Sequence, residues 1–175
     1  TYASYLTTTT PEMSATITDN HGDTSVYINK YGFDMAALIE TTIYFRSDKY
    51  TGDNKSDYKV VATWKNANGV DKTATYLIEG SADECTGYYT SELQNGVPRA
   101  NRYTFGFTEL ASYDLRQEVT FTIYDGENEV SGGYSASVEA LMYTSIQKGS
   151  YDTATVDMFY AVINYSDAAR AFFCN

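Results

Sequence analysis

Tyrosine is the residue type in this chain with the clearest chemical potential. The 175 residues include 18 Tyr and a single Trp. Flat aromatic faces stack on sugar rings, while Asn, Asp, Gln or Arg side chains hydrogen-bond to the sugar hydroxyls. Tyrosine is also common in β-strands because its ring packs well on a pleated surface. The composition therefore favours either a carbohydrate contact surface or a β-rich core.

Three groups of aromatic residues are candidates for a sugar contact. Tyr27, Tyr44 and Tyr124 lie on the outward side of predicted strands, although helices packed on the sheet would cover them. A polar loop and the Tyr88–Tyr89 pair form the second group, and one residue of that pair should face inward if the segment is a strand. Trp64 is the third, and its alternation with Val60 and Ala62 also fits a core position. The candidate ligand-binding residues are Tyr50, Asn54, Tyr58, Trp64, Tyr88, Tyr89 and Tyr124.

Calcium is a second candidate ligand. Asp48, Asp53 and Asp57, together with Asn54, place hard oxygen ligands in one loop, and Asp19, Asn20 and Asp23 do so in another. Neither group has the spacing of a known calcium loop, and turn formation or solubility explains such residues more often than a bound metal does. A structural calcium ion is thus an open alternative, and no other cofactor is expected.

The sequence contains no recognised catalytic motif. It has no G-x-S-x-G, H-E-x-x-H, G-x-G-x-x-G or C-x-x-C pattern. His21, the single histidine, lies in a predicted turn, where it is poorly placed for a Ser-His-Asp triad. We therefore expect a protein that is not an enzyme.

Charge and hydropathy limit the partners. The formal net charge is −11 and the pI is near 4.4. Nucleic-acid binding requires clustered Lys and Arg, so it is excluded, and no run of about 18 apolar residues predicts a membrane span. The acidic surface tolerates a neutral glycan. Cys85 and Cys174 either pair or remain free thiols, and the sequence does not decide between these states.

Short alternating segments predict a mainly β fold. We expect strands near 12–18, 25–30, 39–46, 58–65, 70–78, 88–93, 102–108, 118–124 and 129–134. Turn signals between them favour an antiparallel β-sandwich, jelly-roll or Ig-like, in a single module over 12–175. Residues 1–11 read as a linker or frayed start, and residues 94–101 as a loop containing Pro98.

Two helices are predicted to follow the strands as a hairpin packed on the sandwich. Ser137 is the expected N-cap of a helix over 137–148, and Asp152 of a helix over 152–173. The second helix carries an apolar stripe that should be buried on the strands. Its members are Val156, Phe159, Val162, Ile163, Ala169, Phe172 and Phe173.

The second half of the chain resembles a module of secreted and cell-surface proteins from gut and rumen Firmicutes. The likeness lies in the aromatic strand and V-T-x-x-x-Y-D-G hairpin between Tyr88 and Gly126, and in the N-Y-x-x-A-A-x-x-F pattern from Asn164 to Phe172. Ser166 and Asp167 stand where those modules have Gly and Ala. The shared residues are packing and turn residues, so the resemblance implies no site residue.

The resemblance implies an exported bacterial protein, extracellular or attached to the cell surface. Such modules often stand beside glycoside hydrolases, leucine-rich repeats or dockerins. The expected function is that of a non-catalytic carbohydrate-binding module of a surface or cellulosome-associated protein, acting on a neutral plant or host glycan. The alternative is a structural spacer or protein-binding adhesion module without glycan affinity, which would position neighbouring domains of a larger surface protein.

Overall fold

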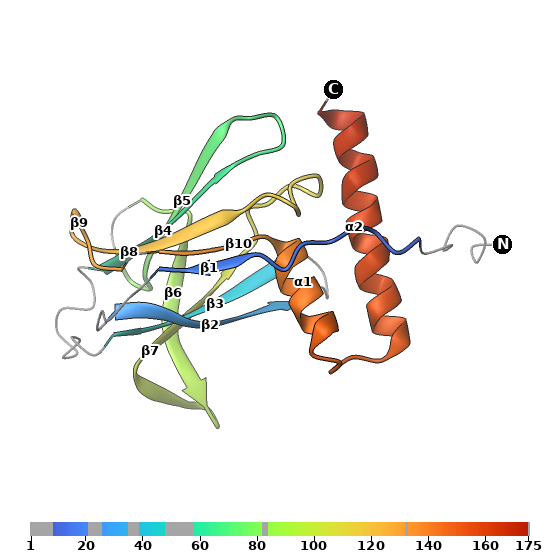
Figure 1. Cartoon of the computed structure of the whole chain (residues 1–175). Helices are drawn as coiled ribbons and strands as arrows, with labels where there is room; N and C mark the ends of the chain where they lie inside the picture. Colours follow the sequence, from blue (N-terminus) through green and yellow to red (C-terminus); the bar gives the residue numbers. More distant parts are fainter. Residues whose placement is uncertain are drawn as a thin grey trace.

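The structure is mainly β with two C-terminal helices, as the sequence predicts (Figure 1). It is a computed structural model that describes residues 9–20, 26–34, 39–47, 58–81, 84–131 and 133–174. The helices follow all the strands in the chain and lie together at one end of the sheet.

Alternating apolar and polar residues form the strands. Their bounds are β1 Ile17–Asp19, β2 Val26–Asp34, β3 Glu40–Ser47, β4 Tyr58–Lys65, β5 Asp71–Ile78, β6 Gly87–Gln94, β7 Val97–Phe107, β8 Val119–Asp125, β9 Asn128–Glu129 and β10 Tyr134–Ala136. On β4, Val60 and Ala62 are buried while Val61 is half-buried and Thr63 is exposed, so one face of the strand is core.

The strands join in one curled, mixed sheet. Their order is β1-β10-β8-β4-β5-β6-β7-β3-β2, with β9 added beside β8. The prediction of a wholly antiparallel arrangement is wrong at one point, because β5 and β6 run parallel, with Leu77 opposite Tyr88. Parallel neighbours require a crossover connection, which the residue alternation of the two strands does not reveal.

The core lies inside the curl, where aromatic side chains from distant strands meet. Phe107 of β7 contacts Trp64 of β4 and Phe121 of β8, with ring centroids 5.4 Å and 5.2 Å apart. Phe105 stacks on Tyr76 of β5 at 4.3 Å. Edge-to-face and offset contacts of this kind add to the free energy gained from burying the rings.

Residues 94–101, predicted as a loop, belong mostly to a long β-hairpin. Asn95 and Gly96 both have positive φ, 53° and 77°, which is the conformation required by a tight two-residue turn. The hairpin formed by β6 and β7 reaches beyond the rest of the sheet (Figure 1). Pro98 is tolerated in this outlying part, where the demand for ladder hydrogen bonds is lower.

Helix α1, Val138–Gln147, begins at the predicted cap, where the amide of Ala140 donates to Ser137 Oγ at 3.0 Å. Its first turns are buried, and Leu141 packs with the core of the sheet. Gly149 follows in a left-handed conformation, with φ of 67°, and ends the helix.

Helix α2, Thr153–Phe173, is also capped as predicted, with the amide of Thr155 donating to Asp152 Oδ1 at 2.8 Å. Its buried residues Phe159 and Ile163 pack with α1 and with Leu115 of the β7–β8 connection. α2 therefore rests on α1 and this connection, with α1 between it and the sheet (Figure 1).

The predicted apolar stripe of α2 is only partly buried. Phe159, Ile163 and Ala169 are buried, whereas Phe172 and Phe173 expose 79% and 61% of their surface. The expectation that the whole stripe is covered is wrong at its C-terminal end. The last turn extends past α1 (Figure 1), and the ring contact of Phe173 with Tyr113 of the β7–β8 connection, with centroids 6.0 Å apart, covers only part of it.

Candidate functional site

An open groove lies across β3, β6 and β7 on the described surface. Its volume is about 710 Å³. Its lining combines hydroxyl, carboxylate and phenol groups with apolar surface, and consists of Tyr44, Glu79, Thr90, Ser91, Glu92, Leu93 and Thr104. We call this feature the β3/β6/β7 groove.

Strand alternation turns the groove residues away from the core. Tyr44 lies between the buried Ile43 and Phe45, and Thr104 lies between the buried Tyr103 and Phe105. Because successive side chains of a strand point to opposite faces, Tyr44 and Thr104 must point outward.

Strand register brings the outward residues into a single row. Tyr44 pairs with Thr104, and Thr104 pairs with Thr90 on the next strand. Neighbouring strands lie about 4.8 Å apart, so the row spans roughly 10 Å, the scale of two sugar units. The phenol stands at one end and two threonine hydroxyls continue from it.

A buried carboxylate belongs to the same groove. Glu92 is only 6% exposed, and its Oε1 accepts a hydrogen bond from Arg99 Nη1 at 3.2 Å. A charged group is rarely buried without a compensating partner, and Arg99 supplies part of that compensation. The Arg99 contact holds the Glu92 carboxylate in place at the groove wall.

The groove offers the contacts that a sugar needs. Carboxylates accept hydrogen bonds from sugar hydroxyls, and protein hydroxyls both donate and accept them. The phenol ring and Leu93 offer apolar surface for C–H faces. Glu79 and Glu92 make the lining acidic, which disfavours anionic ligands. The chemistry therefore suits a neutral polyhydroxylated ligand.

The inside of the curled sheet offers no comparable space among the described residues. The hollow next to α1, lined by Ile43, Phe107, Leu141 and other apolar residues, has a volume of about 10 Å³. That volume is about the minimum for one water molecule. A ligand site of this size would therefore have to lie on the outer surface.

Three of the predicted ligand-binding aromatics are buried in the core, which corrects their assignment. Tyr89 is fully buried and donates its hydroxyl to the carbonyl of Tyr58 at 2.9 Å, and Tyr58 itself is 2% exposed. Trp64 is buried against Phe107. Rings enclosed in this way cannot stack on an external sugar, so Tyr58, Tyr89 and Trp64 are structural.

The other predicted aromatics lie apart from one another or outside the described residues. Tyr88 is half exposed, and a hydrogen bond with the Cys85 side chain raises its pKa. Tyr124 is half-buried, with Lys59 Nζ 5.7 Å from its ring centroid. Neither lines the β3/β6/β7 groove. Tyr50 and Asn54 lie outside the described residues.

Most of the residues predicted to bind calcium lie outside the part of the chain that the structure describes. Asp48, Asp53, Asp57 and Asp23 all lie outside the described ranges. Within those ranges, no group of three or more His, Cys, Asp or Glu residues is arranged to hold a metal ion. Cys85 and Cys174 are both free thiols.

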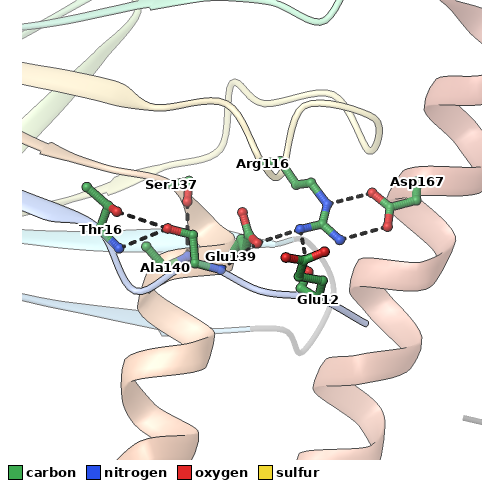
Figure 2. A network of polar contacts seen from close by, with 8 residues as sticks. Glu12, Thr16, Arg116, Ser137, Glu139, Ala140 and Asp167 are labelled. Atoms are coloured by element: carbon green, nitrogen blue, oxygen red, sulfur yellow. Dashed lines mark hydrogen bonds and ion pairs between the residues drawn. The ribbon is translucent and has the colours of Figure 1, made fainter. Parts of the chain in front are cut away.

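A second cluster of charges joins the connection between β7 and β8 to both helices (Figure 2). Arg116 donates to both carboxylate oxygens of Asp167 on α2, at 2.6 Å and 2.8 Å, and to Glu139 of α1. It also donates to the carbonyl of Glu12, at 2.9 Å. The guanidinium is paired with both carboxylates, so we interpret the cluster as structural. We call it the Arg116 clasp.

The groove residues other than Tyr44 were not predicted as a site. Thr90, Thr104 and Glu92 belong to strands in which they read as ordinary outward residues. The available signal was the alternation Tyr103-Thr104-Phe105, which marks Thr104 as opposite the core. Their convergence depends on the pairing of β3 with β7 and β6, which a single sequence does not contain.

Searches of protein-family models, curated proteins and solved structures found no match. Among the described residues, no helix is both long enough and apolar enough to cross a membrane.

Proposed function

We propose that this chain is a non-catalytic carbohydrate-binding module that holds a neutral glycan in the β3/β6/β7 groove. The observation that carries the proposal is the outward row Tyr44-Thr104-Thr90 beside the buried Glu92 carboxylate. The groove is open along the sheet, as a polymer would require. One ring is available for stacking, so the affinity should be modest, with a dissociation constant of about 10⁻⁵–10⁻³ M.

Further parts of the proposal come from the resemblance. We place the chain outside the cell or on the surface of a bacterium, as a β-sandwich module of a larger protein that handles polysaccharides. A formal charge of −11 fits this role because it keeps the module soluble and free of polyanions. The proposed ligand is a plant or host glycan without charged groups.

Affinity electrophoresis in gels that contain neutral polysaccharides tests the proposal. The native chain should be retarded by at least one polysaccharide, and the Tyr44→Ala variant should migrate as in a gel without polysaccharide. Tyr88→Ala is the matched control, since Tyr88 is exposed on β6 but does not line the groove. Equal migration of all three proteins across a broad panel would contradict glycan binding.

A structural spacer or adhesion module is the second candidate function. The observation in its favour is that Tyr58, Tyr76, Tyr89, Tyr103 and Tyr134 are all buried. Many of the tyrosines therefore fill the core and are not available to bind a ligand. A spacer needs only a stable fold and contact surfaces for its neighbours, and it predicts no retardation on any glycan.

A further inference from the structure

Two Asn-Gly pairs of this chain lie at the tips of β-hairpins, in turns of different construction. Asn68-Gly69 joins β4 to β5, and Asn95-Gly96 joins β6 to β7. Asparagine is chemically labile before glycine, because no side chain shields the glycine amide from the asparagine carboxamide. Both asparagines are exposed, so the construction of the turns decides where this chemistry occurs.

The Asn68 turn is held by several hydrogen bonds. The Gly69 amide donates to the carbonyl of Asn66 at 2.9 Å, and the Asn68 amide donates to Asn66 Oδ1 at 3.0 Å. The Ala67 amide donates to the buried Asp114 carboxylate at 2.7 Å, which ties the turn to the β7–β8 connection. The glycine amide of this turn is therefore engaged, and the turn resists opening.

The Asn95 turn leaves its glycine amide unengaged. Gln94 and Val97 are paired as the last residues of their strands. Between them, Asn95 and Gly96 have φ of 53° and 77°. In a two-residue turn of this kind the backbone hydrogen bond joins the flanking residues, so it does not use the Gly96 amide. Among the described residues, that amide has no hydrogen-bond partner.

The surroundings of Asn95 favour a reaction that creates negative charge. The β6–β7 hairpin carries the turn beyond the rest of the sheet, and Gln94 to Pro98 are all exposed (Figure 1). The turn can therefore open without loss of core contacts. Asn95 shares a hollow of about 530 Å³ with Arg99 and Arg102. Their guanidinium groups favour negative charge beside Asn95, both during attack by the amide and in a product carboxylate.

We propose that Asn95 is a modification site at which the folded chain converts a carboxamide into a carboxylate. The Gly96 amide nitrogen attacks Cγ of Asn95 and forms a carbon–nitrogen bond. The carboxamide nitrogen leaves as ammonia and takes the proton of the Gly96 amide. Water then adds to one carbonyl group of the cyclic imide and opens it, which leaves aspartate or isoaspartate at position 95. Neither oxidation nor reduction is involved.

Peptide mapping of the folded chain tests the site. The chain is incubated at pH 8 and 37 °C and then digested briefly with trypsin at mildly acidic pH. Cleavage after lysine and arginine places Asn68 in the peptide 66–72 and Asn95, as its only asparagine, in the peptide 73–99. The mass gain of amide-to-acid conversion should grow about tenfold faster in 73–99, because attack by Gly69 first requires loss of its hydrogen bond. Equal rates in the two peptides, or no gain in 73–99, would overturn the proposal.

Incubation in guanidinium chloride is the control for structure. Unfolding removes both turns, so the two Asn-Gly pairs should then react at similar rates. A preference for Asn95 that persisted in the unfolded chain would show that the turns do not set it, and would overturn the structural argument. The Asn95→Gln variant should lose the mass gain in 73–99, because the longer side chain forms the cyclic imide far more slowly. An unchanged gain in that variant would also overturn the proposal.

Discussion

Two buried tyrosines of this chain differ in whether their hydroxyl groups are hydrogen-bonded. Tyr89 is buried with its hydroxyl bonded to the Tyr58 carbonyl. Tyr76 is buried, and its hydroxyl has no hydrogen-bond partner among the described residues. Burial, with a smaller contribution from Glu109, raises the pKa of Tyr76 well above its ordinary value. Both rings fill the core, but only one hydroxyl is satisfied.

Removing these two hydroxyls should therefore have opposite effects. Tyr89→Phe leaves the Tyr58 carbonyl without its partner and should lower the free energy of unfolding by about 1–2 kcal/mol. Tyr76→Phe removes an unsatisfied group and should leave the free energy unchanged or raise it by up to about 1 kcal/mol. Urea unfolding followed by tyrosine fluorescence measures both. A larger loss in Tyr76→Phe than in Tyr89→Phe would contradict this description of the core.

The Arg116 clasp is the residue-level feature on which the placement of both helices depends. Arg116→Ala should lower the free energy of unfolding by about 2–4 kcal/mol, because it leaves the buried Glu139 carboxylate without its guanidinium partner. Lys65→Ala is the matched control, since it removes the exposed ion pair with Asp71 and should cost less than about 1 kcal/mol. Similar losses in the two variants would show that the clasp is not buried as described.

At the scale of elements, both helices could be predicted from local signals. Ser137 and Asp152 each cap a helix through their own side chains, and Gly149 ends α1. Capping involves residues within one turn, so it is visible in the sequence. The burial of α2 was predicted less well, because Phe172 and Phe173 carry the same apolar signal as Phe159 although both stay largely exposed, with Tyr113 covering only part of Phe173.

The Asp152 cap gives α2 a dependence on pH. Hydrogen bonds from the Thr155 side chain and amide hold the pKa of Asp152 below its ordinary value. The stabilisation from this carboxylate is therefore fully present above the unfolded pKa of about 4, and is lost as the pH falls through the lower folded value. The stability difference between native chain and Asp152→Ala should be largest near pH 7 and shrink below pH 4. Thermal unfolding at 222 nm measures it, and a difference that grows on acidification would contradict the capping role.

At the scale of the whole molecule, most strand positions were predictable but the way the strands are joined was not. The exceptions are the strands expected at 12–18 and 129–134, where the structure has β1 at Ile17–Asp19, β9 at Asn128–Glu129 and β10 at Tyr134–Ala136. Alternation located the inward residues of β4 and β8, such as Val60 and Phe121, because it depends only on neighbours in the chain. The parallel contact of β5 with β6 and the row across β3, β7 and β6 depend on partners far away in sequence. For this reason Tyr44 could be predicted as outward, whereas the groove around it could not.

The central claim is that a neutral glycan binds in the β3/β6/β7 groove. Amide chemical-shift mapping during titration with the best-retained neutral oligosaccharide tests it most directly. We predict saturable shifts at Tyr44, Thr90 and Thr104, with no comparable change at Thr63 and Thr73, which line a separate hollow on β4 and β5. Saturable shifts confined to Thr63 and Thr73, or no shifts at millimolar concentrations of every neutral glycan tested, would contradict the account.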